Sequence, residues 1–481
     1  MRSELKDKVA QGVSWSMAEK AGSTLLQVVV SIVLLRLLLP DDLGVIALLT
    51  SFSAIALIVV DSGFSQTLIR KAEPHPDDFK SVFLFNITVS VVLYLLLVGL
   101  SPVVAWYYDQ PIITRLAPFF FLQVPINALC VIQNTIFTRQ FRFSLLSKVI
   151  FASSFVSGAV AIGMALAGCG VWSIVGQQLT MMSVRAGLLW WASAWRPTAH
   201  FDRSTLRAMA PYSLSLMTTD LITTLYNKIP QLFLGKVFSV DVLGYFDAAR
   251  KFKDQSVTSV VSSVQNVTFP ALANIASDER KFAESYRQVV MVVTFVMFPA
   301  MLGLIAVAED LFTVLVGAKW LPAIPYLRVF CLTGLFYPVT MIAYNVLKVK
   351  SDGKIIVRLE IVKKILMTAI LALTIFYSVL AVVWGLVAMS CIEMCLNIGV
   401  ARRFVTLSLQ RLLRTVLPVA LVTAAMFAAT WGVGQLIGDP LVRLVAEIAT
   451  GAVTYVALSA AFRLEAFREV TTMLRRQLKR S

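Results

Sequence analysis

Six charged residues lie deep inside long apolar stretches of this sequence, many residues from the nearest polar connector: Lys20, Asp220, Lys228, Arg250, Lys251 and Glu393. Hydrocarbon tolerates a charge only where the side chain faces a protein interior or a water-filled cavity. Buried cations suit an anion with several acceptor oxygens, such as a pyrophosphate. A buried carboxylate without a partner becomes protonated or holds a cation. The pattern therefore predicts a membrane protein with a polar interior, where its function should be sought.

The densest group of cations lies in the segment "LGYFDAARKFKDQ". At about 1.5 Å per residue, Arg250, Lys251 and Lys253 lie roughly 12–17 Å below the outer end of an expected helix. Such cations are prohibitively costly against lipid, so we expect Arg250 and Lys251 to face the space between two halves of the protein and to bind the anion. Lys253 points in a different direction and can extend its ammonium group toward water.

Local neutralisation is the alternative for these cations. Asp247 with Lys251, and Arg250 with Asp254, are each four residues apart, which is the spacing of ion pairs along a helix. Even fully paired, these side chains need water or protein around them, so a polar interior remains expected.

Lys20 and Asp220 are 200 residues apart and correspond under the internal repeat described below. We expect them at similar depth on opposing halves, as a gate pair or as separate anion and cation sites. Lys228 lies two turns beyond Asp220, just before Pro230, where a kink can open the backbone to a cavity. Structural hydrogen bonding between helices is the alternative for these residues.

Glu393 is a lone carboxylate in an apolar stretch, with Asn397 one turn later. Together with Asp220 it is a candidate for coupling to H⁺ or Na⁺, or for gating. A permanently protonated carboxyl group bonded to a backbone carbonyl is the alternative.

The elements that position these residues are apolar spans. The chain has 481 residues, of which 58% are hydrophobic and 15% charged, whereas soluble domains carry about a quarter charged residues. This composition predicts an all-α polytopic membrane protein with about 14 helices of roughly 20 residues or more. The expected spans are 11–36, 42–64, 81–104, 115–137, 146–168, 171–193, 208–235, 242–272, 288–308, 322–346, 355–378, 380–400, 412–436 and 441–462.

Basic residues concentrate in alternate connectors, such as those with Arg139 and Arg142 or with Lys348 and Lys350. This alternation follows the positive-inside rule and places both termini in the cytoplasm. The net charge of +16 is therefore a consequence of topology and gives no case for nucleic acid.

An internal repeat appears when the sequence is shifted by 200 residues, because "LLRLLLPDDLG" then aligns with "LGKVFSVDVLG". Two copies of six spans predict parallel repeats with a substrate site at their interface, a plan common in transporters. The expected parts are an N-terminal lobe (1–197), a cytoplasmic linker (198–207), a C-terminal lobe (208–404), two further helices (405–463) and a basic amphipathic cytoplasmic tail (464–481). The tail is expected to lie as a helix on the membrane surface, with a plain solvated tail as the alternative.

Signs of enzyme chemistry are missing from the sequence. The only histidines, His75 and His200, lie in short connectors, and the five cysteines have no metal-like spacing. We find no nucleotide-binding loop and no long outside connector to house a catalytic site. The sequence therefore predicts a protein that is not an enzyme, without metal or cofactor apart from a coupling ion.

Five motifs in order, "EKAGSTLLQ", "LLPDDLGVIAL", "DSGFSQTLIRK", "LGYFDAARKF" and "FPALANIASDERKFAESYR", resemble the Wzx-type bacterial polysaccharide flippases of the MOP transporter superfamily. The resemblance runs from the first span through the ninth. It implies a two-lobed transporter of the bacterial inner membrane that flips undecaprenyl-pyrophosphate-linked oligosaccharide by alternating access, for exopolysaccharide, O-antigen or capsule synthesis. By this resemblance the cations near Lys20 and Arg250 would meet the pyrophosphate.

The resemblance also implies ion coupling, contact with membrane lipids, and a polysaccharide polymerase and co-polymerase as partners. Cation-coupled multidrug antiporters and the peptidoglycan-precursor flippase share the layout and remain alternatives. An antiporter is expected to have an apolar or negative interior, and a polymerase of the same pathway would need a sizeable outside loop.

Overall fold

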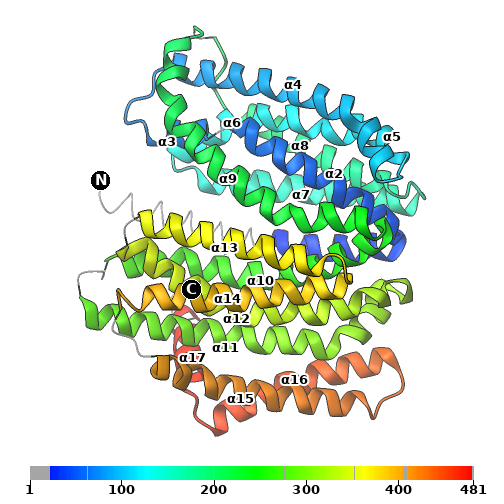
Figure 1. Ribbon diagram of the computed structural model, residues 1–481, viewed down its shortest axis with the longest axis vertical. Helices are drawn as coiled ribbons and strands as arrows, with labels where there is room; N and C mark the ends of the chain where they lie inside the picture. Colours follow the sequence, from blue (N-terminus) through cyan, green and yellow to red (C-terminus); the bar gives the residue numbers. More distant parts are fainter. Residues whose placement is uncertain are drawn as a thin grey trace. The chain divides into compact units, whose positions relative to one another are not determined.

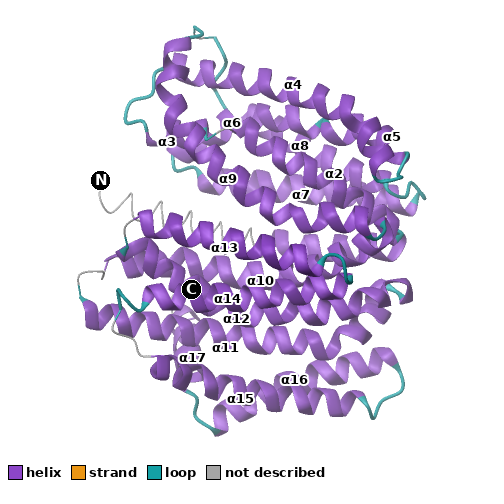
Figure 2. Cartoon of the chain, in the orientation of Figure 1, coloured by secondary structure: helices purple, strands orange, loops and turns teal. Residues whose placement is uncertain are grey.

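The computed structural model describes residues 22–61, 63–198, 200–274, 278–351, 353–405 and 409–478. Within these ranges all regular structure is helical, and short loops join the helices (Figure 2). Apolar spans favour helices in a membrane because hydrocarbon offers no partners for backbone N–H and C=O groups. The prediction of an all-α fold is confirmed.

The helices form two compact units, Met1–Asp247 and Ala248–Ser481. The first contains a helix described from Gly22 to Leu37, then α2 (Pro40–Asp61), α3 (Phe64–Arg70), α4 (Pro76–Tyr107), α5 (Ile112–Phe121), α6 (Gln123–Arg139), α7 (Phe143–Leu166), α8 (Trp172–Ala192) and α9 (Arg203–Val237) (Figure 1). α10 (Val240–Asn274) begins in this unit and continues in the second. α9 packs against α2, α3 and α4, so contacts group it with helices of the first half.

The second unit contains the remainder of α10 and then α11 (Glu279–Leu311), the π-helical turn η1 (Phe312–Val316), the 3₁₀ segment η2 (Ala318–Ala323), α12 (Ile324–Lys350), α13 (Gly353–Thr374), α14 (Val379–Ala401), α15 (Leu409–Gly434), α16 (Pro440–Ala461) and α17 (Glu465–Leu478). The strongest packing within it joins α12 with α14, α11 with α12, and α15 with α16.

Every expected span overlaps a described helix, and nine helical spans within the described residues are long and apolar enough to cross a membrane. The protein is therefore a multi-pass membrane protein. The total of fourteen spans and the side on which the termini lie stay predictions.

The span expected at 115–137 consists of two helices, α5 and α6, which meet at Leu122. Pro125 lacks the N–H that would bond to the carbonyl of Phe121, so the helical ladder is interrupted here. The side-chain amide of Gln123 donates to the carbonyl of Phe120 at 2.9 Å, next to this interruption. The pair can still cross the membrane as one bent unit.

The linker before α9 is held to the start of α4. The backbone N–H of Asp202 donates to the Ser81 hydroxyl at 2.7 Å, and the Thr205 hydroxyl donates to the Asp78 carboxylate at 3.0 Å. Asp202 is also the N-cap of α9. Hydrogen bonds from the Thr205 and Ser204 hydroxyls and the Ser204 backbone N–H lower the pKa of Asp202 to about 2, so this cap stays charged.

Candidate functional site

The two copies of the repeat meet at the N-terminal ends of α2 and α10. A β-carbon at Gly44 would overlap the carbonyl oxygen of Val240, and one at Gly244 would overlap the carbonyl oxygen of Pro40. These pairs exchange roles under the 200-residue shift, which is the signature of a contact across a two-fold axis. Only glycine permits so close an approach of two backbones. The matched motifs in the sequence therefore form one reciprocal helix crossing.

A buried polar chain lies deeper in the first unit, between α2, α9 and α10. Ser51 donates to Oε1 of Gln231 at 3.3 Å, and Nε2 of Gln231 donates to Oδ1 of Asp247 at 2.7 Å. All three residues are buried, with exposures of 0%, 3% and 4%. Sequence spacing pairs Asp247 with Lys251 on the same helix, whereas its donor Gln231 comes from α9 and cannot be inferred from spacing.

The cations of α10 follow within two turns of Asp247. Nε of Arg250 lies 3.5 Å from Oδ2 of Asp254, and Nζ of Lys253 lies 2.5 Å from Oδ1 of the same carboxylate. The Arg250 side chain is 26% exposed and that of Lys253 is 16% exposed, while Lys251 is exposed. The Arg250–Asp254 pair of the neutralisation hypothesis is thus present, and Lys253 shares it.

Charge balance in this stretch remains positive. From Asp247 to Asp254, Arg250, Lys251 and Lys253 contribute three positive charges, and the two aspartates contribute two negative charges. An arginine has five N–H donors and a lysine three, so these side chains can offer several donors to the oxygens of an anion. This arrangement is chemically suited to an anion.

Glu393 of α14 is half-buried and has charged neighbours on α13. It lies within electrostatic range of Lys363, Glu360 and Lys364. Lys363 is 5% exposed; its ammonium group lies 2.8 Å from Glu360 and 4.9 Å from the centre of the Tyr344 ring. The sequence did not indicate these neighbours, because they lie on another helix, about 30 residues away. Glu393 therefore belongs to a polar cluster of the second unit.

Asn397 and Tyr337 connect this cluster to α12. The Asn397 side chain donates to the carbonyl of Thr340 at 3.2 Å and is buried. Tyr337 lies within electrostatic range of both Asp254 and Glu393. Tyr337 of α12 thus lies near one carboxylate of α10 and one of α14.

Asp220 and Lys228 lie on α9 in the first unit. Asp220 is exposed and lies within electrostatic range of Asp61 on α2, whose carboxylate accepts a hydrogen bond from Ser65. Lys228 is half-buried and precedes the buried Pro230 by two residues. Lys20 lies outside the described residues, so its expected relation to Asp220 stays a prediction.

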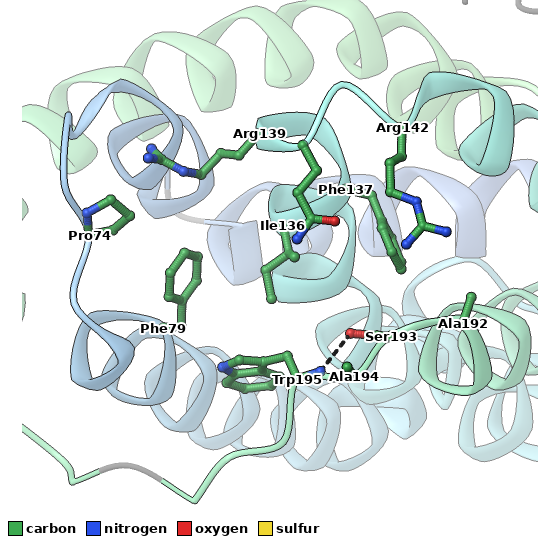
Figure 3. A pocket seen from close by; sticks show the side chains of 11 residues that line it. Pro74, Phe79, Ile136, Phe137, Arg139, Arg142, Ala192, Ser193, Ala194 and Trp195 are labelled. Atoms are coloured by element: carbon green, nitrogen blue, oxygen red, sulfur yellow. Dashed lines mark hydrogen bonds between the residues drawn. The ribbon is translucent and has the colours of Figure 1, made fainter.

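A pocket of about 390 Å³ opens in the first unit between α4, α6 and the segment after α8. Figure 3 shows Arg139 and Arg142 pointing to opposite ends of it. The Arg139 guanidinium donates to the carbonyls of Leu68, Ile69, Lys71 and Ala72 at 2.6–3.2 Å and so caps the end of α3. Arg142 lies over the Phe137 ring at 5.1 Å. Arg139 therefore stabilises the end of α3.

No group of three or more histidine, cysteine, aspartate or glutamate side chains that could hold a metal ion occurs in the described part of the chain.

Comparisons with known proteins give a consistent assignment. The family model described as "Polysaccharide biosynthesis protein" matches residues 33–325. The teichuronic acid biosynthesis protein TuaB of Bacillus subtilis is 24% identical over 463 residues, which cover 94% of this chain and 95% of that protein. The succinoglycan biosynthesis transport protein ExoT of Rhizobium meliloti is 24% identical and covers 76% of this chain and 74% of its own length. The lipopolysaccharide biosynthesis protein WzxC of Escherichia coli is 24% identical over 69% of this chain and 68% of its own.

Solved structures share the fold. The lipid II flippase MurJ in an inward closed conformation superposes with a TM-score of 0.73 at 14% identity, covering 95% of this chain and all (100%) of that one. An inward-facing multidrug resistance MATE family transporter of the MOP superfamily gives a TM-score of 0.62 at 15% identity, covering 79% of this chain and 94% of that one. The chain thus shares its helical fold with these two transporters.

Proposed function

Because the family model covers more than half of its length, the chain belongs to the polysaccharide biosynthesis protein family, and we propose that it is a flippase for lipid-linked oligosaccharide. The substrate is an oligosaccharide joined through pyrophosphate to undecaprenol, carried from the cytoplasmic to the periplasmic leaflet of the bacterial inner membrane. The relatives support this proposal, since their names assign them to teichuronic acid, succinoglycan and lipopolysaccharide synthesis, and one is named a transport protein.

The positive surplus on α10 is the observation that carries the proposal. A pyrophosphate presents several acceptor oxygens, and charge-assisted hydrogen bonds to such oxygens are among the strongest in proteins. Arg250 and Lys251 would hold the pyrophosphate, with Lys228 and Lys20 as further contacts. The sugars would occupy the aqueous cleft, while the prenyl chain stays in lipid. A multidrug antiporter for cations would instead be served by negative or apolar side chains here.

Alternating access requires the two repeats to part on one side of the membrane at a time. We assign the reciprocal crossing at Gly44 and Gly244 to the outer ends of α2 and α10. The protein itself performs no bond chemistry; a polymerase and co-polymerase would take up the flipped units.

Ion coupling through Asp220 and Glu393 is part of the proposal. Their neighbours support it: Asp220 is near another carboxylate, Asp61, and Glu393 is near the buried cation Lys363. Binding or release of H⁺ or Na⁺ would change the net charge of each cluster. Transport that is insensitive to both Asp220→Asn and Glu393→Gln would remove the two residues from the coupling mechanism.

The test uses a strain in which the chromosomal copy is deleted and plasmid-borne variants are compared. Arg250→Ala, Lys251→Ala and the double variant are expected to reduce surface polysaccharide, with lipid-linked oligosaccharide accumulating on the cytoplasmic side. Accessibility of the sugars is measured with a membrane-impermeant glycosidase on right-side-out vesicles. Arg402→Ala, which removes an exposed arginine just after α14, is the matched control.

Two outcomes would overturn the proposal. If the deletion strain presents lipid-linked sugars outside at the normal rate, the chain is not the flippase. If the double variant transports normally at normal membrane levels, the cations of α10 do not bind the pyrophosphate. Efflux of cationic dyes that is lost on deletion, with sugar export intact, would favour the antiporter instead.

A further inference from the structure

A second basic pocket lies in the second unit, away from the cations of α10. It has a volume of about 470 Å³ and is formed by α11, the start of α15 and the turn between α16 and α17. α15 and α16 run side by side at the edge of the unit, next to α11, as Figure 1 shows. The charged side chains that line the pocket are Arg287, Arg411, Arg414, Arg463 and Glu465.

The charges of this pocket do not cancel. Arg287 donates to both oxygens of Glu465 at 2.9 and 2.5 Å, and also to Glu284 at 2.8 Å. Glu465 is the one carboxylate among the lining residues, and its bonds to Arg287 join α17 to α11. The positive surplus comes from Arg411, Arg414 and Arg463, all three of which are exposed.

The turn that presents Arg463 is well defined. The N–H of Arg463 donates to the carbonyl of Ala460 at 3.1 Å, and the N–H of Leu464 donates to the carbonyl of Ser459 at 3.0 Å. This pair of bonds is a Schellman motif, with Arg463 in the left-handed region at φ 50°. Glycine is the residue that adopts this conformation without strain, so the arginine is kept at a conformational cost.

Apolar side chains continue from the pocket along α15. Leu413, Leu417 and Leu421 follow one another at four-residue intervals on one face, and they are 57%, 55% and 62% exposed. Such a stripe on a membrane-spanning helix faces lipid acyl chains. Phe462, beside Arg463, is 68% exposed. The pocket is thus a group of arginines at one end of a lipid-facing apolar stripe.

We propose that this pocket binds the phosphate headgroup of an anionic membrane phospholipid, whose acyl chain lies along the exposed leucines of α15. Arg414 and Arg463 bind the phosphate oxygens, and Arg411 adds to the positive potential. Basic pockets between helices at the cytoplasmic boundary are typical sites for anionic lipid headgroups. The inference does not depend on the substrate that the protein transports.

Two other pockets among the described residues suit this chemistry less well. In the pocket near α3 and α9, Lys71 lies 2.6 Å from the Asp78 carboxylate, and Arg70 stacks on the Tyr212 ring at 4.8 Å. In the pocket of Figure 3, Arg139 is bound to four carbonyls. Only the pocket of the second unit combines a positive surplus with an adjoining apolar stripe among the described cavities.

The experiment measures binding of phosphatidylglycerol to the purified full-length protein in neutral detergent, by native mass spectrometry and by the rise in the midpoint of thermal unfolding. The double variant Arg414→Gln/Arg463→Gln is compared with Arg358→Gln/Arg402→Gln, which removes two exposed arginines elsewhere in the same unit. We expect affinity to fall about tenfold per pocket arginine, since a charge-assisted hydrogen bond of about 1.4 kcal/mol corresponds to a factor of ten. The control is expected to stay within about twofold.

Three further arms decide the source of the phosphate. Phosphatidylcholine is expected to bind at least tenfold more weakly than phosphatidylglycerol, and inorganic phosphate is expected to cause no comparable rise in the unfolding midpoint. Equal binding of phosphatidylcholine, an equal effect of inorganic phosphate, or tighter competing binding of undecaprenyl phosphate would each overturn the proposal. So would unchanged affinity in the pocket variant. If the double variant does not fold, Arg414→Gln alone carries the test, with a tenfold loss expected.

Discussion

Replacing Gly44 with alanine places a methyl group against the backbone of α10. The added β-carbon would overlap the carbonyl oxygen of Val240, and the corresponding change at Gly244 would overlap that of Pro40. Because both obstacles are backbone atoms, no side-chain rotation relieves the overlap, and the ends of α2 and α10 have to separate. The perturbation therefore acts on the reciprocal crossing itself.

Two opposing effects set the change in the free energy of unfolding. Overpacking of a tight contact costs about 1–3 kcal/mol, while alanine gains about 1 kcal/mol over glycine inside a helix. Gly99 of α4 has no atom within 4 Å of its β-carbon position, so Gly99→Ala should show the gain alone. The crossing variants should thus be less stable than Gly99→Ala by about 1–3 kcal/mol. At roughly 1–2 °C per kcal/mol for a chain of this size, the unfolding midpoints should differ by about 1–6 °C.

The double variant Gly44→Ala/Gly244→Ala distinguishes one shared contact from two separate ones. Once the first methyl group has parted the helices, the second meets less resistance, so the combined loss should be smaller than the sum by about 0.5 kcal/mol or more. The measurement is the thermal unfolding midpoint of purified protein in detergent for all four forms. If Gly44→Ala raises the midpoint as Gly99→Ala does, or if the two losses add, the reasoning is refuted.

Three further outcomes follow from other contacts. Gln231→Leu should lower stability by about 1.5–3 kcal/mol, because Asp247 loses its donor while buried; the double change Gln231→Leu/Asp247→Leu should recover part of the loss in the same unfolding assay. Arg139→Lys should lower the unfolding midpoint, since an ammonium group cannot reproduce the planar fork that binds four carbonyls; an unchanged midpoint would contradict the capping role. The bonds from Arg287 lower the pKa of Glu465, so its contribution to stability is present above the unfolded value near 4.5 and is lost as pH falls through the folded value. Glu465→Gln should therefore lower the midpoint at pH 7 and should lower it progressively less as the pH falls through the folded value, and an effect of constant size over that range would count against the clamp.

Much of the fold could be predicted from the sequence, because the physical rule behind it is local. A bilayer demands about 20 consecutive apolar residues in a helix, and the expected spans overlap the described helices throughout. The division of one span at Leu122 was missed, although Pro118 and Pro125 were visible signals. The glycines of the repeat were noticed as a sequence match, but their reciprocal contact needs the structure.

The neighbours of the charged residues could not be predicted, because they come from other helices. Nothing in the sequence near Asp247 indicates Gln231, and nothing near Glu393 indicates Lys363. Intrahelical pairs, such as Arg250 with Asp254, were predictable, since a spacing of four residues places them on one face of a helix. Sequence spacing thus predicts ion pairs within one helix, whereas the neighbours from other helices depend on how the helices pack.

The functional assignment depends on α10 more than on the fold. The same architecture serves a lipid II flippase and a multidrug transporter, so the shared helices do not choose between an anionic and a cationic substrate. Family membership points to polysaccharide synthesis, and the side chains of α10 give that choice a physical basis. Its buried carboxylate, Asp247, accepts a hydrogen bond from Gln231, and together with Asp254 it supplies two negative charges against the three cations of this stretch. We propose that Arg250 and Lys251 are present on α10 because an anion must be held there and then released.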